Sequence, residues 1–253
     1  MNLDSLKQDW EHFAKQDALW AILSDERKAG GKWDIAEFMA TGDVEIRTVI
    51  DYLAGINLSP NFSGEALDFG CGVGRLTQAL ARHFASCVGV DISQQMIQKA
   101  ESLSRYPHCR YVASAGARLP FADASFSFIY SNIVLQHVPP RYSWQYLREF
   151  VRLLGPSGIL VFGVQDFFAG SLLRRIRSAT RIRSRVKEAL GEPIIKMYCL
   201  PERGVRRVLG SAKVADIQFT NTAAKDFNGK LVFLQQAPTA GYVSKQYCVV
   251  KQP

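Results

Sequence analysis

The sequence predicts an α/β fold in which a mostly parallel sheet carries helices on both faces. Between about residues 65 and 165, short apolar runs alternate with stretches of helical periodicity, which is typical of repeated βα units. The apolar runs show little alternation of polar residues, as expected for strands that are covered on both faces. The chain has 253 residues, 47% of them hydrophobic, which is enough for one large core.

Five strands are expected in this region, at 66–69, 87–90, 110–112, 126–130 and 158–163. Apolar residues at spacings of three and four predict the helices between them, marked by Leu76, Leu80 and Phe84, by Met96, Ile97 and Ala100, and by Trp144, Leu147 and Val151. The third helix is expected to stop at Gly155-Pro156. Beyond a helix at 201–209, the runs 214–220 and 242–250 are expected to pair antiparallel at the sheet edge.

Neither flank holds enough apolar sequence for a core of its own, so we expect one domain over 1–253. Residues 1–60 would form a helical N-terminal cap, and 166–253 an insertion followed by the final strands. The sequence shows no membrane-length apolar run and no signal core, which predicts a soluble, cytoplasmic protein. Five cysteines without C-x-x-C pairs indicate reduced thiols and no metal site.

The net charge of +8 is concentrated in one segment, 174–187, which carries seven basic and no acidic residues. Subtracting those seven from eight leaves +1 for the rest of the chain. Any electrostatic partner therefore has to be argued from this segment alone. Apolar residues at helical spacing within it predict an amphipathic helix with a basic face.

A glycine-rich turn follows the first predicted strand, with Gly70, Gly72 and Gly74 at alternate positions. Glycines allow positive φ and close approach of a ligand to the backbone. Asp91 ends the next strand, about twenty residues on, where a carboxylate can accept hydrogen bonds from both hydroxyls of a ribose. These residues predict a nucleotide-like ligand, and by themselves they leave a dinucleotide and adenosylmethionine both open.

Four motifs occur in a characteristic order: LDFGCGVGR (67–75), VGVDIS (88–93), LPFADASFSFIYS (119–131) and LLGPSGILVF (153–162). Through them the sequence resembles the class I S-adenosylmethionine-dependent methyltransferases, in particular the type 11 group related to quinone-biosynthesis enzymes. The resemblance covers about 65–165. It implies a Rossmann-like sheet with an antiparallel last strand, and S-adenosyl-L-methionine as the cofactor of the G-x-G-x-G turn.

The resemblance also implies roles for single residues. Asp68, Gly70, Gly72 and Gly74 would border the methionine half of the cofactor, Asp91 would bind the ribose, and Ile92 and Met96 would cover the adenine. Two positions depart from the family. Ala115 lies where relatives often carry an Asp, so the backbone near Ala115 would replace it, and Ser127 stands where the family has the Asp of a Phe-Asp pair.

His137 follows the fourth strand, at the sheet end where the donor methyl group is expected, and its ordinary pKa suits a general base near neutrality. The alternative is a histidine at a helix entry, bonded to backbone. Asn132 would contact the donor or the acceptor, or else cap the turn. For Arg75 the solvated state is favoured over a carboxylate partner. Residues 33–42 resemble the family's cap and predict an amphipathic helix that ends at Gly42.

The leading hypothesis is methyl transfer to a small-molecule or saccharide acceptor, at oxygen, with His137 as base. A phosphate- or lipid-linked glycan would let segment 174–187 meet an anion, and the same segment could contact an anionic membrane or form a solvated helix face. One alternative is an RNA methyltransferase that uses 174–187, although the chain lacks an N-P-P-Y-like motif after strand four and no stable nucleic-acid complex is expected. The other is a non-catalytic, cofactor-binding partner protein, suggested by Ala115 and Ser127. The sequence does not define the oligomeric state.

Overall fold

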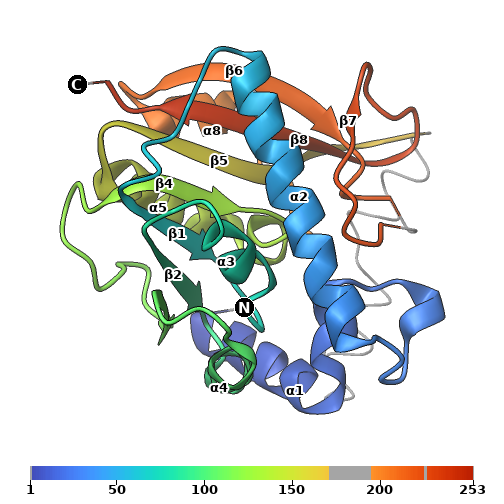
Figure 1. Cartoon of the computed structure of the whole chain (residues 1–253). Coiled ribbons are helices and arrows are strands. Elements are labelled where there is room, and N and C mark those ends of the chain that lie inside the picture. The colour runs from blue at the N-terminus through green and yellow to red at the C-terminus, as the bar shows by residue number, and fades with distance from the viewer. Residues whose placement is uncertain (1, 171–194, 225–226, 253) are drawn as a thin grey trace.

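A computed structural model of the chain describes residues 2–170, 195–224 and 227–252. Its centre is one eight-stranded sheet with the order β3-β2-β1-β4-β5-β8-β6-β7 (Figure 1). The strands are β1 Glu65–Phe69, β2 Ser86–Asp91, β3 Cys109–Ala113, β4 Phe126–Ser131, β5 Leu154–Ala169, β6 Lys213–Thr220, β7 Phe233–Leu234 and β8 Gly241–Val250. Strands β1 to β5 pair in parallel, and β8 lies antiparallel to β5, which confirms the predicted fold class.

Helices cover both faces of this sheet (Figure 1). The α-helices are α1 Leu3–Ile22, α2 Ile35–Gly55, α3 Arg75–Leu80, α4 Gln94–Leu103, α5 Pro140–Leu153 and α8 Glu202–Leu209, and the short 3₁₀ helices are η1 Glu26–Lys28 and η2 Leu135–His137. Helix α2 crosses the front of the sheet in Figure 1, and α5 and α8 lie behind it.

Alternate residues of the central strands feed two separate apolar cores. Leu67 and Ile129 point to the face covered by α5 and α8, where they meet Leu147 and Phe150. Their strand neighbours point to the opposite face, where Phe128 packs with residues of α2 and α3. Burial on both faces explains why these strands read as continuous apolar runs in the sequence.

The N-terminal cap is anchored to the main sheet through α4. Glu11 on α1 accepts hydrogen bonds from the backbone N–H groups of Gln94 (2.6 Å) and Gln95 (3.2 Å) at the start of α4. A carboxylate at this position satisfies free amide donors and complements the positive end of the helix dipole. Asp17 has non-helical backbone angles inside α1, so the helix bends before it reaches Ile22.

Several predicted boundaries were wrong. Helix α2 does not end at Gly42 but continues to Gly55, and a Cβ at Gly42 would lie 2.4 Å from the carbonyl oxygen of Arg75. This glycine therefore permits close helix contact rather than marking a helix end. The runs 214–220 and 242–250 do pair antiparallel as predicted, as β6 and β8, but the short strand β7, which the sequence did not predict, lies outside them at the edge.

Among the described residues, no helix combines the length and the apolar character needed to cross a bilayer. The basic segment 174–187 lies outside the described residues, so the predicted basic helix has no structural account here.

Candidate functional site

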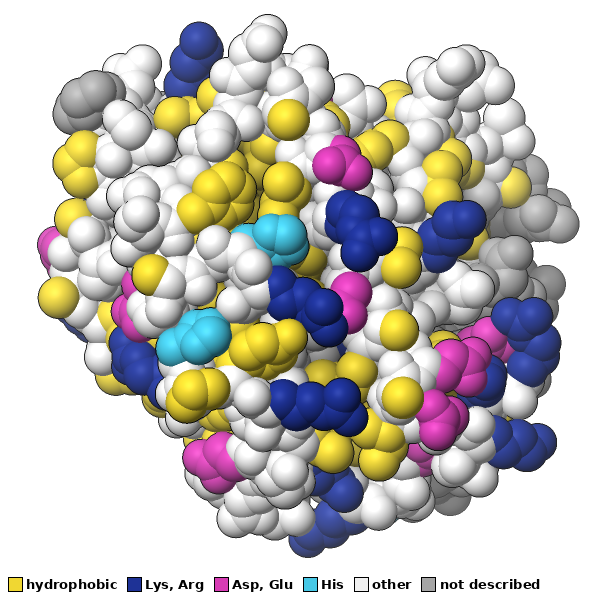
Figure 2. Space-filling view, in the orientation of Figure 1, with side chains coloured by type: hydrophobic (Ala, Val, Ile, Leu, Met, Phe, Trp, Pro, Cys, Tyr) yellow, Lys and Arg dark blue, Asp and Glu magenta, His cyan; other side chains and the backbone are white. Residues whose placement is uncertain are grey.

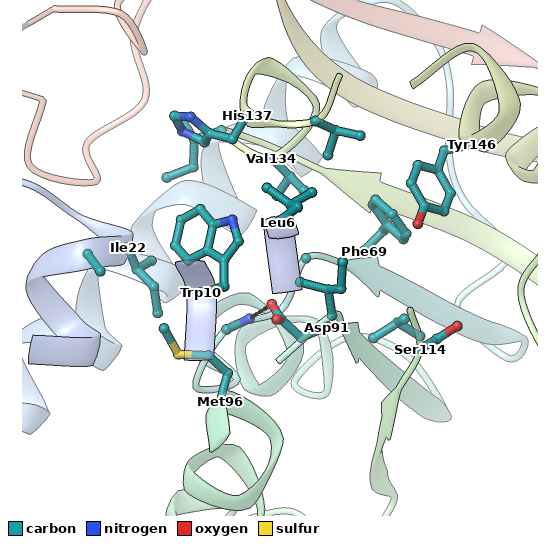
Figure 3. A pocket seen from close by; sticks show the side chains of 17 residues that line it. Leu6, Trp10, Ile22, Phe69, Asp91, Met96, Ser114, Val134, His137 and Tyr146 are labelled. Carbon is teal, nitrogen blue, oxygen red and sulfur yellow. Dashed lines mark hydrogen bonds between the residues drawn. The ribbon is translucent and has the colours of Figure 1, made fainter. Parts of the chain in front are cut away.

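A cavity opens at the carboxyl ends of β1, β2 and β4 and is covered by α1 (Figure 3). Strands β1 and β4 are parallel neighbours although β2 and β3 intervene in the chain, so the strand order reverses here, and open α/β sheets bind ligands at such points. The lining residues are Leu6, Trp10, Ala21, Ile22, Phe69, Gly70, Gly72, Val90, Asp91, Ile92, Met96, Ser114, Ile133, Val134, His137, Val138 and Tyr146.

The glycine turn forms one wall of the cavity. Gly70, Gly72 and Gly74 all have positive φ, at 79°, 53° and 83°, which side chains disfavour. A Cβ at Gly70 would lie 2.3 Å from Val134, and one at Gly72 would lie 2.5 Å from Ile22. The turn therefore needs glycine both for its backbone conformation and because the cap and the loop after β4 pack directly on it.

Asp91 faces the cavity from the end of β2. Its Oδ2 accepts from the N–H of Gly72 and its Oδ1 from the N–H of Ser93, both at 2.9 Å. Burial raises the pKa of Asp91 to about 6, and the two backbone hydrogen bonds oppose that rise. Each carboxylate oxygen keeps a further lone pair and can accept one more hydrogen bond. Two ribose hydroxyls can therefore donate to Asp91.

Apolar side chains surround the carboxylate. Ile92 and Met96 line the cavity beside Asp91, as the adenine-binding assignment requires. Ala115 does not line it, and its neighbour Ser114 does. The carbonyl of Gly116 accepts from the Tyr146 hydroxyl at 3.1 Å, so α5 holds this loop in place.

Three other predicted cofactor residues are not among those that line the cavity: Asp68, Gly74 and Asn132. Asp68 is buried beneath the turn, where its Oδ2 accepts from the Thr77 hydroxyl at 2.7 Å and burial raises its pKa to about 7. Gly74 caps α3 and packs on Tyr111. Asn132 is also buried, and its amide donates to Glu45 at 2.8 Å.

Glu45 on α2 and Arg75 on α3 form a buried ion pair, Nη2 to Oε2 at 2.8 Å. Arg75 is only 2% exposed, so the favoured expectation of a solvated side chain was wrong. The other oxygen of Glu45 accepts from the Tyr130 hydroxyl at 2.9 Å and from Asn132. This network fixes α2 against the first turn of α3 and the end of β4.

His137 lies at the other end of the cavity and is half-buried. Its Nδ1 lies 2.8 Å from the carbonyl of Lys196, so Nδ1 donates and Nε2 is left as the acceptor. The Gln136 amide nitrogen lies 3.2 Å from Nε2. Burial lowers the pKa of His137 to about 4, so the ring is neutral at physiological pH.

The cap contributes cavity residues that sequence reasoning did not assign to the site. Leu6, Trp10 and Ile22 line it from α1, and Figure 3 shows Trp10 between His137 and Met96. The Trp10 and His137 rings meet edge to face with centroids 5.9 Å apart. The aromatic residues near the N-terminus indicate a packed helix, but their periodicity does not show what they pack against.

Ser127 lies away from the cavity, near the start of β4, and its hydroxyl donates to the carbonyls of Asn61 (2.9 Å) and Glu65 (3.2 Å). The missing Asp at this position therefore concerns the attachment of the segment before β1. It does not alter the walls of the cavity.

Residues 67–162 match a family model described as "Methyltransferase domain". The chain is 28% identical to the trans-aconitate 2-methyltransferase of Streptomyces avermitilis over 62% of this chain and 61% of that protein. It is 27% identical to the malonyl-[acyl-carrier protein] O-methyltransferase of a Methylovorus species, over 61% of this chain and 52% of that protein. The chain thus spans between half and two thirds of the length of these curated relatives.

Among solved structures, the magnesium protoporphyrin IX methyltransferase from Synechocystis with bound S-adenosylhomocysteine superposes with a TM-score of 0.60. The alignment covers 98% of both chains at 18% identity, so this likeness concerns the fold. Three features of the structure fit the matched family: the sheet order, the glycine turn and the carboxylate at the end of β2. Residues 67–162 are thus a methyltransferase domain with the class I fold, and S-adenosylmethionine is the cofactor of this family.

Proposed function

We propose that the protein transfers the methyl group of S-adenosylmethionine to an oxygen atom of a small-molecule acceptor, with His137 as general base. The observation that carries this proposal is that Asp91 and His137 line the two ends of one cavity. A cofactor held at Asp91 and an acceptor beside His137 would then meet inside a single enclosed space.

The residues at the Asp91 end fit the cofactor. We assign the ribose hydroxyls to Asp91, the adenine to the apolar side chains of Ile92 and Met96, and the methionine half to the turn at Gly70 and Gly72. When bound, the cofactor supplies an electrophilic methyl group on a sulfonium. The protein's own tasks are to orient the acceptor, to exclude water through the α1 cover, and to accept a proton.

The His137 end fits an acceptor that loses a proton. As the acceptor oxygen bonds to the methyl carbon, the carbon–sulfur bond breaks and the hydroxyl proton moves to Nε2 of His137. The positive charge thus passes from sulfur to the imidazole. The hydrogen bond from Nδ1 to the Lys196 carbonyl holds the ring in the tautomer that can accept, and it stabilises the charged ring that results.

Oxygen methylation also agrees with the name of the malonyl-[acyl-carrier protein] O-methyltransferase among the relatives. Two relatives are named for trans-aconitate and for malonyl-[acyl-carrier protein]. For this chain we therefore place small acids and hydroxyl compounds first in an acceptor screen. A carboxylate acceptor needs no base, so the effect of changing His137 separates the two classes.

The test is release of S-adenosylhomocysteine with panels of small carboxylic acids, phenols, sugars, sugar phosphates and RNA. We expect turnover with a hydroxyl acceptor in the wild type, and weaker cofactor binding in Asp91→Ala. His137→Gln should bind the cofactor normally and lose about 10² to 10⁴-fold in kcat. Turnover by His137→Gln within tenfold of wild type would exclude the base, and turnover with RNA alone would overturn the small-molecule acceptor.

The seven basic residues of segment 174–187 are the reason to propose a phosphate-bearing glycan acceptor or a membrane contact. Replacing Arg174, Arg177 and Arg181 with Ala should raise the acceptor KM if the acceptor carries phosphate, and should leave cofactor affinity unchanged. If the wild type pellets with anionic but not with neutral vesicles and the variant no longer does, the segment contacts a membrane instead. Unchanged values in both assays would favour a solvated helix face.

A further inference from the structure

A chain of side-chain hydrogen bonds runs from His137 into the sheet. The Gln136 amide nitrogen contacts Nε2 of His137 at 3.2 Å, and the Gln136 oxygen accepts from the Gln165 amide at 2.6 Å. The Gln165 oxygen in turn accepts from the Ser244 hydroxyl at 2.7 Å. Gln136, Gln165 and Ser244 are 6%, 0% and 1% exposed, so water does not compete for these groups.

These hydrogen bonds all run the same way, from Ser244 through Gln165 and Gln136 toward His137, and we call the three residues the relay. Ser244 donates to the Gln165 oxygen, which turns the Gln165 amide N–H toward Gln136. The Gln136 oxygen is thereby occupied, and its amide N–H has to face His137. An N–H group facing Nε2 is compatible with a lone pair there and incompatible with a second N–H.

The other ring nitrogen is held from the opposite side by the segment that carries Lys196. The N–H of Tyr198 donates to the Gln136 carbonyl and the N–H of Leu200 donates to the Gln165 carbonyl, both at 2.7 Å. The backbone positions of the relay and of the Lys196 carbonyl are therefore coupled. Each ring nitrogen of His137 has a partner whose orientation is set by neighbouring bonds.

We propose that Gln136, Gln165 and Ser244 act as positioning residues for His137: they fix the proton on Nδ1 and hold the imidazole neutral, with Nε2 unprotonated. The relevance of this relay to catalysis rests on the proposed function, in which Nε2 receives the acceptor proton. When the acceptor binds, its hydroxyl takes over the site at Nε2 where the Gln136 N–H now lies.

Few other ionisable groups among the described residues lie near His137. The titratable side chains that share a cavity wall with it are Asp9 on α1, Asp91 at the end of β2, Tyr146 on α5 and Lys196. The lowered pKa of His137 comes from burial, opposed by the hydrogen bond to Lys196, without a contribution from those charges. The Gln136 amide is the polar group that lies against Nε2.

The first test is nitrogen-15 NMR of the His137 ring across pH, which needs no acceptor. The wild type should show the Nδ1–H tautomer and titrate well below the ordinary histidine range. Gln136→Leu should raise the pKa of His137, because it removes a bond made to the neutral ring alone. Gln165→Leu and Ser244→Ala should change it in the same direction, and Ser244→Thr should restore the wild-type value.

A double-mutant cycle provides the decisive result, because Gln165 acts only through Gln136 in this proposal. In the Gln136→Leu background, Gln165→Leu should leave the pKa of His137 unchanged. Full additivity, or unchanged pKa values in the three single variants, would overturn the relay. Gln246→Leu is the matched control, since Gln246 lies two residues from Ser244, is equally buried, and its side chain has no hydrogen-bond partner among the described residues.

The second test is the pH dependence of kcat, whose acid limb should move in each variant by the same amount as the pKa measured by NMR. If His137→Gln keeps wild-type turnover while the NMR cycle is non-additive, the relay stands and the base assignment fails. If His137→Gln is inactive while the NMR cycle is additive, the base stands and the relay fails.

Discussion

Arg75 and Glu45 form an ion pair in which the arginine side chain is 2% exposed and the glutamate is fully buried. Arg75 directly follows the glycine turn, and Glu45 lies in the middle of the long helix α2. A buried pair of this kind adds little net stability compared with apolar residues, but removing one partner leaves a charge without compensation. The pair therefore makes the position of the turn depend on α2.

Glu45→Ala should destabilise the protein by about 3 to 5 kcal/mol, because it leaves the Arg75 guanidinium buried and also deprives Tyr130 and Asn132 of their acceptor. Denaturant unfolding followed by circular dichroism measures the change. Val44→Ala, at an exposed neighbouring position of the same helix, should stay within about 0.5 kcal/mol of wild type. A loss below about 1 kcal/mol in Glu45→Ala would contradict the buried pair.

Asp68→Asn should stabilise the protein strongly at pH 8 and less at pH 5. Burial raises the pKa of Asp68 to about 7 from 3.8, and one of its oxygens has no hydrogen-bond partner among the described residues. The folded wild type therefore binds a proton more tightly than the unfolded chain, and it loses stability as pH rises from about 4 through 7. Asn removes this dependence and keeps an oxygen for Thr77.

Unfolding free energies at both pH values test this, with a difference of roughly 1 to 3 kcal/mol expected between them for the variant relative to wild type. The exposed Asp51→Asn on α2 is the control, and it should show no such difference. An equal effect of Asp68→Asn at pH 5 and pH 8 would mean that the carboxyl group stays ionised throughout.

Affinity for S-adenosylmethionine should fall below about pH 6. Burial raises the pKa of Asp91 to about 6, and ribose hydroxyls that donate to it favour its ionised form. Binding therefore releases a proton when the free carboxyl is protonated, and affinity declines by up to about tenfold per pH unit below the pKa. Calorimetry at pH 5 to 8 measures this decline.

Asp91→Ala should weaken binding by roughly 1.5 to 3 kcal/mol at pH 7.5 and abolish the decline. Asp123→Asn, an exposed carboxylate paired with Arg152, should bind like the wild type. Unchanged affinity in a folded Asp91→Ala variant would remove Asp91 from the ribose site.

The sequence predicts the parallel half of the sheet well, because βα units bury local apolar runs and the glycine turn has a local backbone signature. It predicts less well which distant residues support the glycine turn and His137. Arg75, Asn132 and Glu45 meet through a helix that comes from another part of the chain, and no local pattern encodes that contact. The same holds for Gln136 and Ser244, which are 108 residues apart and meet only through Gln165.

For His137, the sequence predicts the location of the side chain but not its pKa. Its place after β4 puts it in the cavity, as its position in the sequence predicts. Its contact with the Lys196 carbonyl is the backbone bond of the alternative reading, and the two readings are compatible because that bond leaves Nε2 free of a proton. The environment changes the expected pH range, since burial lowers the pKa of His137 to about 4.

With a hydroxyl acceptor, kcat should therefore be flat between about pH 6 and 8 and fall only below about pH 5, because a base acts in its deprotonated form and the pKa of this ring is lowered. An unperturbed histidine, with a pKa near 6.5, would instead give a rate that rises about fivefold or more between pH 5.5 and 7.5. Kinetics at saturating S-adenosylmethionine separate these profiles from the effect of Asp91 on cofactor affinity.

The matched control is His83→Gln, because His83 is exposed on another surface and its change should leave the profile intact. In His137→Gln the residual rate should lose the acid limb near pH 4 to 5. A rise centred near pH 6.5 in the wild type would mean that the ring is hydrated during catalysis. An acid limb that survives in His137→Gln would assign the titration to the acceptor, and orientation alone would then carry the transfer.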